Sequence, residues 1–380
     1  MRVLHILNEL RPSGAEEMLR IAGPYWSSLG CDLHIVSIAP EPGDFAETLK
    51  AAGWTVHCTG RLPNSLALWR SLSGFLRDLS PDIMHIHPEG YGLLPVLCGV
   101  RHGLPMARTV HNVFRFEGLL KTRKTLERWL SSRLGVRFLA ISESVLANEN
   151  ARFRNPCELC WNWIDTARFR PPSEEERRSA RQTLGIPEDK SLMVSVGNGS
   201  DVKNYRVIIE AMARLEDPGL LYCQVGHPHP DGTDARLVQD LGLARQVRLV
   251  GPSHEVRTWL WAADVFVMPS IYEGFGLAAA EALATGCPCV FSDCPGLRDF
   301  RTLGMSATWV EPTARAFEAA IRSALDGTPD TADHHARASE AAAVFSSARR
   351  AHAYFSVWQQ LRKIPDSGPL HASGSRNPPH

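Results

Sequence analysis

The sequence lacks a long apolar run and an excess of either charge, and each absence excludes a class of protein. No apolar run approaches the ~18–20 residues that a membrane-spanning helix needs. Lys plus Arg and Asp plus Glu both number 41, so no net basic field favours nucleic acid as a partner. The apolar stretch between Arg2 and Asn8 is too short for the core of a secretory signal and predicts a buried first strand. We therefore expect a cytoplasmic protein that binds no nucleic acid.

Cysteine occurs without a pattern that would indicate disulfides or a metal site. The nine cysteines are odd in number and scattered, mostly within apolar runs, so we expect reduced thiols that pack as small apolar side chains. Cys157 and Cys160 have the spacing of a metal or redox pair. They lie in a strand-like stretch with no second ligand pair in reach, so we predict no metal there.

A length of 380 residues favours two domains of roughly 150–200 residues each. Short β-branched runs alternate with helical patterns in two successive series, which is typical of doubly wound parallel sheets. The predicted strands are residues 3–7, 33–38, 55–57, 83–86, 107–110, 138–141 and 158–161, then 192–196, 220–225, 247–250, 265–268, 288–291 and 308–310. We therefore predict an α/β protein with two Rossmann-like doubly wound domains that face each other across a cleft.

The domain boundary is predicted where Pro171 and Pro172 interrupt the chain before a charged cluster, because proline cannot continue a helix or a central strand. The hinge is then near residues 165–172. A helix with an aromatic face follows the second series and is predicted to pack back on the first domain, and a Pro-, Gly- and Ser-rich end is predicted to be disordered. The predicted parts are an N-terminal domain (1–165), a C-terminal domain (173–344), the terminal helix (345–364) and the tail (365–380).

The stretch "SIYEGFGLAAAEALATGCPCVFSD" joins a buried strand to a short helix through a glycine-flanked turn. Glu273 precedes the turn and Glu281 lies about one turn into the helix. The first N–H groups of such a helix form an anion site, and small alanines leave room for a bulky group. The pattern favours a nucleotide site, in which Glu281 accepts hydroxyls of a ribose. A general acid–base pair and two solvated glutamates are the alternatives.

Two further loops have the same strand–glycine–helix plan. In "LMVSVGNGSDVKN", Gly197 ends a buried strand and lets backbone approach closely, and Lys203 is a mobile cation suited to a diphosphate. In "HILNELRPSGAEE", the loop around Gly14 precedes a helix in the other domain. Neither loop has the spacing of a nucleoside-triphosphatase loop or of a dinucleotide fingerprint, which argues against those classes.

These segments together resemble the retaining glycosyltransferases of family 4, which have the two-domain GT-B fold. The family's E-x7-E motif corresponds to Glu273 and Glu281. Other stretches match in the family's order: "PDIMHIH", "TVHN", "AISESV", "NWIDTARFRP", "VGNGSDVKN" and "LGLARQVRLVGPSHEVRTWLWAADVFVMPS". The resemblance covers nearly the whole chain, from Met1 to about residue 363.

The resemblance implies a donor site in the C-terminal domain. Glu281 would hold the donor ribose, Glu273 the donor sugar, and Lys203 would neutralise the leaving diphosphate. The family often has arginine where this chain has Asn198, so one diphosphate cation is absent or comes from elsewhere, for example from Arg206. The remaining residues implied to bind the donor are Gly197, Asn198 itself, Gly274, Phe275, Gly276 and Leu277.

The resemblance also implies a role for the N-terminal domain. Gly14 would lie by the donor phosphates and the acceptor. His111 corresponds to the family's cleft-facing histidine near the reacting sugar, although it would otherwise be interpreted as a polar residue at a strand end. Glu89, Tyr91 and Asn112 are the predicted acceptor-side residues. Trp163 replaces a usual glycine in "NWID", which would alter the hinge.

The implied activity is transfer of a hexose or N-acetylhexosamine from a nucleoside-diphosphate sugar to an acceptor hydroxyl, with retention, in the synthesis of cell-surface glycans or glycoconjugates. A UDP-sugar is the expected donor and GDP-mannose the next candidate. His111, Lys203 and Glu273 would be catalytic. No cofactor is expected, and since the chain has no Asp-x-Asp pair we predict metal-independent activity. The alternatives are a non-catalytic sugar-nucleotide-binding subunit and a nucleotide-sugar epimerase of the same fold.

Residues 121–137, "KTRKTLERWLSSRLGVR", hold six basic residues and one acidic residue, with leucines and a tryptophan at helical spacing. A basic amphipathic helix can lie on an anionic membrane surface, here the inner membrane face. The alternative is a solvated surface helix with one buried face.

Overall fold

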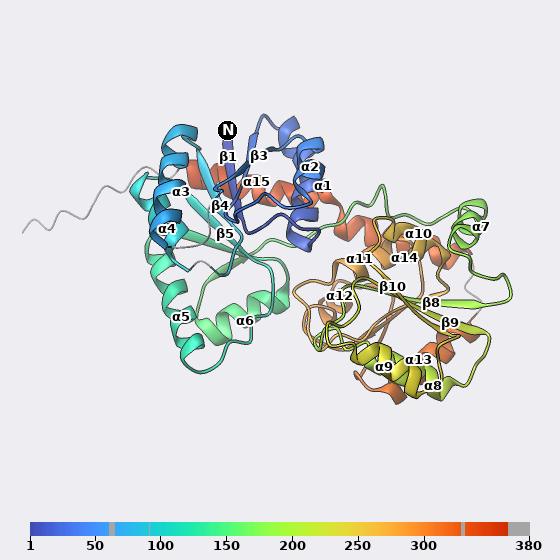
Figure 1. The fold of residues 1–380 in the computed structure, drawn as a ribbon. Helices are drawn as coiled ribbons and strands as arrows, with labels where there is room; N and C mark the ends of the chain where they lie inside the picture. The colour runs from blue at the N-terminus through green and yellow to red at the C-terminus, as the bar shows by residue number, and fades with distance from the viewer. Residues whose placement is uncertain (61–64, 91, 328–330, 364–380) are drawn as a thin grey trace, which may run out of the picture.

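The computed structural model describes residues 1–60, 65–90, 92–327 and 331–363, which form two α/β domains. The first sheet has seven strands in the order β3-β2-β1-β4-β5-β6-β7, and the second has six in the order β10-β9-β8-β11-β12-β13. Every strand pair in the two sheets is parallel. Figure 1 shows the two domains side by side, each with helices on both faces of its sheet. The predicted fold class is confirmed.

In the N-terminal domain the central strands are almost continuously buried, as expected for parallel strands covered on both faces. Its strands are β1 (Arg2–Leu7), β2 (Asp32–Ser37), β3 (Thr55–Cys58), β4 (Ile83–Ile86), β5 (Met106–Val110), β6 (Val136–Ala140) and β7 (Cys157–Leu159). Its helices are α1 (Gly14–Ser28), α2 (Ala46–Ala51), α3 (Ser65–Leu79), α4 (Leu94–Arg101), α5 (Gly118–Arg133) and α6 (Glu143–Phe153).

The C-terminal domain repeats the same strand order, so both sheets have a point where the order reverses: between β1 and β4, and between β8 and β11. Ligands of such sheets bind beyond the carboxyl ends of the strands at this point. Its strands are β8 (Ser191–Val196), β9 (Leu220–Val225), β10 (Val247–Gly251), β11 (Val265–Met268), β12 (Cys289–Ser292) and β13 (Thr308–Val310). Its helices are α7 (Glu174–Thr183), α8 (Arg206–Leu215), α9 (Thr233–Asp240), α10 (Val256–Ala262), α11 (Leu277–Ala284), α12 (Arg298–Thr302), α13 (Ala314–Asp326) and α14 (Thr331–Phe345).

The chain crosses between the domains twice, and the two crossings lie side by side. Ile164 forms an isolated bridge with Ser346, and the Ile164 N–H donates to the carbonyl of Phe345 at 3.2 Å. Trp163 is fully buried and its Nε1 donates to the carbonyl of Met18 at 3.1 Å. The tryptophan in "NWID" therefore attaches the first crossing to α1 of the N-terminal domain.

The single helix predicted at residues 345–364 is interrupted near its start, where the chain makes its second crossing between the domains. Phe345 is the last residue of α14, which packs on α11, and the terminal helix α15 runs from Ser347 to Lys363. The boundary falls at Ser346 because that residue pairs with Ile164 instead of continuing a helix. Helix α15 packs on α1, where the Trp26 indole donates to the carbonyl of Ala351 at 2.9 Å. Figure 1 shows α15 among the N-terminal elements.

The basic helix also differs from its predicted bounds. Helix α5 ends at Arg133, because Gly135 takes a positive φ of 86° and the chain then enters β6. The predicted tail (365–380) and Tyr91 lie outside the described residues. No helix in the described ranges has the length and apolarity that crossing a membrane requires. All nine cysteines are free thiols.

Candidate active site in the interdomain cleft

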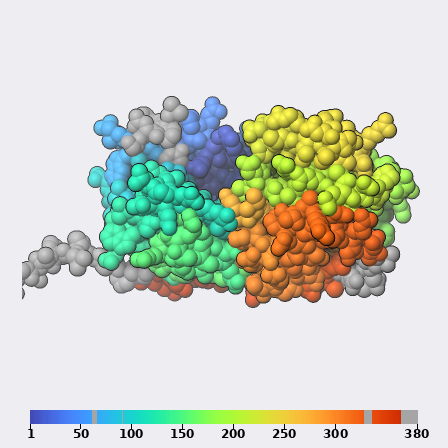
Figure 2. All heavy atoms as spheres, turned by 90° about the horizontal axis from the view of Figure 1, so that it is seen from below, coloured from blue at the N-terminus to red at the C-terminus, as the bar shows by residue number. Residues whose placement is uncertain are grey.

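A cavity of about 300 Å³ lies where the two domains meet, at the strand-order reversals of both sheets. In Figure 2 the two lobes meet along the middle of the molecule, and N-terminal residues are set back between them. The lining comes from both domains: Leu7, Asn8, Ser13, Gly14, Ala15, Glu16, His87, Pro88, His111, Asn112, Ile141 and Asn162 from the first, and Glu273, Gly274, Phe275 and Leu277 from the second. Of the residues predicted for the site, seven line this cavity: Gly14, His111, Asn112, Glu273, Gly274, Phe275 and Leu277.

Glu273 and Lys203 form an ion pair at the edge of the cavity. The Lys203 Nζ lies 2.8 Å from Glu273 Oε1, and the Ser270 hydroxyl donates to the same oxygen at 2.6 Å. Both ion-pair side chains are mostly buried, at 23% and 12% exposure, so this pair is better shielded than a surface salt bridge. The loop after β8 and the loop after β11 are thereby connected through one carboxylate.

Gly197 makes room for this pair. It ends β8 with φ of 141°, and a Cβ atom there would lie 2.8 Å from the Tyr205 hydroxyl and 3.3 Å from Lys203 Cε. Any larger residue would displace the lysine stem. Asn198 does not line the cavity, and its Oδ1 accepts from the His227 N–H at 3.0 Å. Arg206 is exposed and pairs with Glu210 on its own helix at 2.7 Å, so it does not replace the missing cation in this structure.

Gly274 lies at a close approach between the two domains. A Cβ atom on Gly274 would lie 2.1 Å from the carbonyl oxygen of His111, so no larger residue fits. The Ser142 hydroxyl donates to the Gly274 carbonyl at 2.7 Å. A second tie lies nearby, where the backbone N–H and hydroxyl of Ser144 donate to the Asp299 carboxylate at 2.8 and 2.6 Å. The sequence analysis missed these three polar residues, because contacts between domains leave no local pattern.

Helix α11 begins at the cavity. Gly276 precedes it with φ of 86°, and its carbonyl accepts from the Ala279 N–H at 3.0 Å. The row of free N–H groups at the start of α11 therefore ends before Ala279. The N–H groups of Gly276, Leu277 and Ala278 have no partner among the described residues. A Cβ on Gly14 would lie 3.0 Å from Leu277 Cδ1, so α1 and α11 begin opposite each other.

Glu281 lies in the second turn of α11, outside the lining of the 300 Å³ cavity. Burial raises the pKa of its carboxyl to about 8, and the carboxylate of Glu17 adds to the effect, while Arg168 and Arg20 oppose it. Arg20 is held on α1 by two bonds to Glu17, at 2.8 and 2.6 Å. Glu281, the residue predicted to bind the ribose, therefore faces charged groups of the N-terminal domain.

His111 lines the cavity from the end of β5, and its Nε2 lies 2.8 Å from Nδ1 of His87. Burial lowers the pKa of His111 to about 4, so this imidazole is neutral at pH 7. Asn112 turns its Oδ1 to the Val113 N–H at 2.8 Å, which leaves its amide N–H groups for the cavity. Glu16 was missed by the sequence analysis. It lines the cavity, accepts from the Ser13 hydroxyl, and burial raises its pKa.

Glu89 belongs to a buried ion network instead of the cavity lining. Its carboxylate contacts Arg128 at 2.9 Å, Arg108 at 3.2 Å and Lys124 at 3.5 Å. Arg128 also bonds to Glu149 at 2.6 Å, and Lys124 to Glu127 at 2.9 Å. Three acids thus balance three bases, so Glu89 holds the loop after β4 in place against α5.

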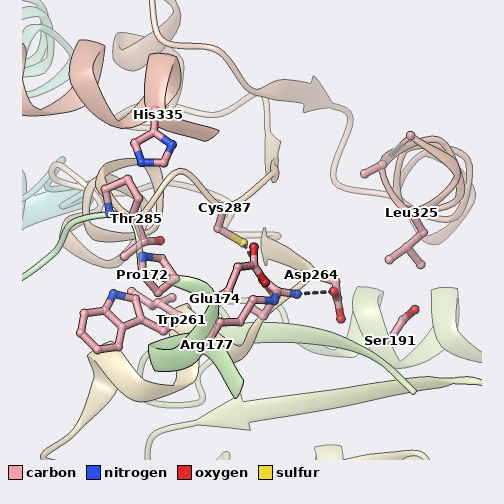
Figure 3. Close-up of a pocket in the computed structure, with 15 residues that line it drawn as sticks. Pro172, Glu174, Arg177, Ser191, Trp261, Asp264, Thr285, Cys287, Leu325 and His335 are labelled. Carbon is pink, nitrogen blue, oxygen red and sulfur yellow. Dashed lines mark hydrogen bonds and ion pairs between the residues drawn. The ribbon is translucent and has the colours of Figure 1, made fainter. Parts of the chain in front are cut away.

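Another cavity, of about 270 Å³, lies on the far side of the second sheet, where β8 begins and before β11 (Figure 3). Two of its charged groups pair within the domain, Arg177 with Asp264 at 2.6 Å. Since ligands of such sheets bind beyond the opposite, carboxyl ends of the strands, the interdomain cavity is the candidate active site.

Two family descriptions match the chain, one in each domain. "Glycosyltransferase Family 4" matches residues 12–168, and "Glycosyl transferases group 1" matches residues 176–344. The chain belongs to the family-4 type of glycosyltransferases with the GT-B fold, as its motifs indicated.

Two curated relatives are D-inositol 3-phosphate glycosyltransferases. The one from Streptosporangium roseum is 29% identical over 285 residues, which are 66% of this chain and 64% of the relative. The one from Thermobispora bispora is 28% identical over 337 residues, 80% of this chain and 78% of the relative. The chain thus spans just under two thirds of the length of the first relative.

Solved structures share the fold over nearly the whole chain. A glycosyltransferase from Rickettsia africae ESF-5 has a TM-score of 0.82 at 16% identity and covers 95% of this chain and 98% of its own. Anabaena HepE in complex with UDP has a TM-score of 0.80 at 18% identity, with 95% and 100% covered. At these identities the likeness shows the fold alone.

Proposed function

We propose that the protein is a retaining glycosyltransferase that moves a hexose or N-acetylhexosamine from a nucleoside-diphosphate sugar to an acceptor hydroxyl. One observation carries the proposal: the Lys203–Glu273 pair and the start of α11 meet His111 and Gly14 of the other domain around one cavity. In this arrangement a cation, a carboxylate and unused N–H groups lie at or beside one cavity. It supports the charge separation that departure of a diphosphate requires.

The diphosphate would lie at the start of α11, where the N–H groups of residues 276–278 are unused. Lys203 would supply the positive charge for the leaving group. Because Lys203 is paired with Glu273, a bound diphosphate would draw the ammonium toward itself and release the Glu273 carboxylate for hydroxyls of the donor sugar. Glu281 would accept the ribose hydroxyls, and the acceptor would enter beside Asn112.

A UDP-sugar is the proposed donor and GDP-mannose the second candidate. The relation of the fold to HepE, whose solved structures include complexes with UDP and with UDP-glucose, supports the first. The acceptor is a hydroxyl compound of unknown identity, in the synthesis of a cell-surface glycan or glycoconjugate. Cytoplasmic location and metal-independent activity stay predictions. Activity that EDTA abolishes and Mn²⁺ restores would contradict the latter.

The deciding experiment is calorimetric titration of UDP, GDP and ADP into the wild type and Glu281→Ala, without metal. We expect UDP to bind the wild type and the variant to lose at least about tenfold in affinity, since removing the side chain leaves buried ribose hydroxyls unpaired, which costs about 1–3 kcal/mol. If none of the nucleotides binds the wild type, the site assignment fails. If one other than UDP binds, the donor is reassigned and the site stands.

Two alternatives differ in their products. A non-catalytic binding subunit, which Asn198 in place of arginine favours, would bind nucleotide and release no product with any acceptor. An epimerase of the same fold would convert the donor sugar without an acceptor. The anomeric configuration of a transferred sugar, measured by NMR, tests retention.

We also propose that α5 contacts a membrane surface, chiefly through exposed apolar side chains and less through its cations than the sequence predicted. Two of its cations, Lys124 and Arg128, are buried in the ion network, whereas its apolar side chains face outward. The exposed apolar side chains are Leu119 (90% exposed), Leu126 (54%), Trp129 (52%) and Leu120 (41%). Apolar contact would therefore contribute more than charge, and Lys121, Arg123 and Arg133 are the cations left to meet anionic lipid.

Co-sedimentation with vesicles of neutral or anionic lipid tests this contact. We expect the wild type to bind anionic vesicles and the pair Leu126→Ser and Trp129→Ser to lose binding, because both side chains are half exposed on α5. Leu241→Ser is the matched control, since Leu241 is 40% exposed on the other domain. Equal binding by all three proteins would refute the contact.

A further inference from the structure

Three histidines on adjacent strands of the first sheet form a continuous row from the core to the cavity. Nδ1 of His5 lies 2.8 Å from Nε2 of His87, and Nδ1 of His87 lies 2.8 Å from Nε2 of His111. His5 is fully buried and His111 lines the cavity. The row thus connects a group in contact with the site to one that no ligand can reach.

The strand register explains the row. On β1 and β4, His5 is paired with His85, so His87 stands two residues further along the same face. On β4 and β5, Ile86 is paired with Arg108, which places His87 level with Thr109 and leaves His111 two residues further on. Each step therefore moves one strand across and two residues toward the carboxyl ends.

The inner end of the row lies among aromatic rings. The His5 imidazole contacts Trp26, Trp54 and Trp358 at centroid distances of 5.8, 5.1 and 5.4 Å. Burial lowers the pKa of His5 and of His87 well below the ordinary value, as it does for His111. All three rings are therefore neutral at pH 7, with one N–H each.

Three protons on six nitrogens allow two arrangements that satisfy both hydrogen bonds. If every ring carries its proton on Nδ1, His5 donates to His87, His87 donates to His111, and the Nδ1–H of His111 is left as a donor. If every ring carries it on Nε2, the direction reverses, and Nδ1 of His111 is left as a bare acceptor. The tautomer of His111 is thus coupled to the tautomer of His5.

The environment of His5 distinguishes the two arrangements. Its Nε2 is buried and has no hydrogen-bond partner among the described residues. The second arrangement would bury an unpaired N–H there, whereas the first leaves only an unpaired acceptor, and buried unpaired N–H groups are the rarer of the two in proteins. Nδ1 of His111 has no partner within the described residues, so it is the end of the row that can meet a ligand.

We propose that His5 and His87 are positioning residues that hold His111 as its neutral Nδ1–H tautomer, a hydrogen-bond donor toward an oxygen of the bound sugar or acceptor. The proposal rests on the proposed function for what the donor contacts, but not for the tautomer itself. A metal bound by His5, His85 and His87, which lie close together, is the competing use of the cluster. It would break the row, since His87 already uses both nitrogens and His85 contacts Thr109 at 2.7 Å and Trp358 at 3.0 Å.

Long-range ¹⁵N–¹H correlation NMR of the ligand-free protein, with ¹⁵N-labelled histidine, tests the tautomer directly. His111→Gln assigns the His111 signals. We expect Nδ1 of His111 to have the shift of a protonated nitrogen and Nε2 that of a bare one. His5→Phe keeps an aromatic ring but removes the first hydrogen bond, so both shifts should move toward each other as the tautomers mix.

His85→Phe is the matched control, because His85 is equally buried and stacks on His5 and His87 at 4.9 and 4.7 Å but contributes no bond to the row. It should leave the His111 shifts in place. A bare Nδ1 in the wild type overturns the proposal, and so does an equal change in both variants. If His5→Phe does not fold, His87→Phe replaces it and the wild-type spectrum still decides. Added Zn²⁺ that shifts His5, His85 and His87 together would support the metal instead and also overturn it.

Titration with UDP separates this proposal from the proposed function. We expect UDP affinity in His5→Phe to stay within about twofold of the wild type, since the donor site lies in the other domain. Failure of UDP to bind the wild type would contradict the donor site and leave the tautomer result standing.

Discussion

Replacing Glu281 by glutamine should stabilise the ligand-free protein at high pH. The carboxyl has a pKa of about 8 in the fold against an ordinary value of 4.5, mainly because the site is buried. A folded-state pKa above the unfolded value means that the folded protein binds more protons between pH 4.5 and 8. The free energy of unfolding that the protonated carboxyl contributes is therefore fully present below pH 4.5 and is lost as pH rises through 8.

The magnitude follows from the size of the shift. About 3.5 pKa units at 1.36 kcal/mol per unit correspond to about 4.8 kcal/mol as an upper bound. Glu281 is partly exposed, so solvent screens its charge, and we expect about 2 kcal/mol. Glutamine resembles the neutral carboxyl and does not titrate. For a domain of this size, Glu281→Gln should raise the unfolding temperature at pH 8.5 by roughly 4–8 °C.

Scanning calorimetry at pH 4.5 and pH 8.5 measures this difference. At pH 4.5 most of the gain should disappear, because the wild-type carboxyl is then neutral in the folded protein. Glu311→Gln, an exposed carboxylate of the same domain, is the control and should show no gain at either pH. A gain of equal size at both values, or a loss at pH 8.5, would refute the reasoning. Comparing transition temperatures avoids assuming that a two-domain protein unfolds in one step.

Three further predictions test the cleft. Lys203→Ala should lower kcat for sugar transfer by about 10²–10³-fold, the cost of removing one group that stabilises developing charge. Lys190→Ala, at a partly exposed lysine away from the cavity, should not lower kcat, and equal rates in the two variants would refute the role. Gly274→Ala should abolish activity and open the cleft, because its Cβ would lie 2.1 Å from the His111 carbonyl oxygen. Small-angle scattering measures the opening. Gly327→Ala is the control and should keep the wild-type scattering curve, since the atom nearest to its Cβ would be 3.6 Å away. Asp299→Asn removes charge-assisted bonds to Ser144 and should weaken domain contact by about 1–3 kcal/mol, seen as faster proteolysis of residues 165–172; unchanged proteolysis would count against it.

The sequence predicted the sheets because parallel strands are continuous apolar runs, which carry a local signal. All thirteen predicted strands are found within two residues of their expected bounds at each end, and β4, β9, β11 and β13 match at both ends. The site loops were predictable from local glycines: Gly197 directly follows β8 and Gly276 directly precedes α11, and both take positive φ, which favours glycine. The ties between domains, such as Ser142 to Gly274, join residues 132 positions apart and leave no such trace.

Helix α5 shows where local pattern fails. For a surface helix, its leucines and tryptophan at helical spacing predicted one buried apolar face. In the structure Leu126 and Trp129 are exposed instead, and the carboxylates of Glu89, Glu127 and Glu149 draw Lys124 and Arg128 to the inner face. Two buried cations need such partners, and the partners come from three different segments. The same network holds the loop that follows His87, so the helix that faces outward with Trp129 also supports the histidine row. A substitution that breaks the network, such as Glu149→Gln, should therefore disturb both helix α5 and the histidine row. A substitution at Trp129 should affect only the outer surface of the helix.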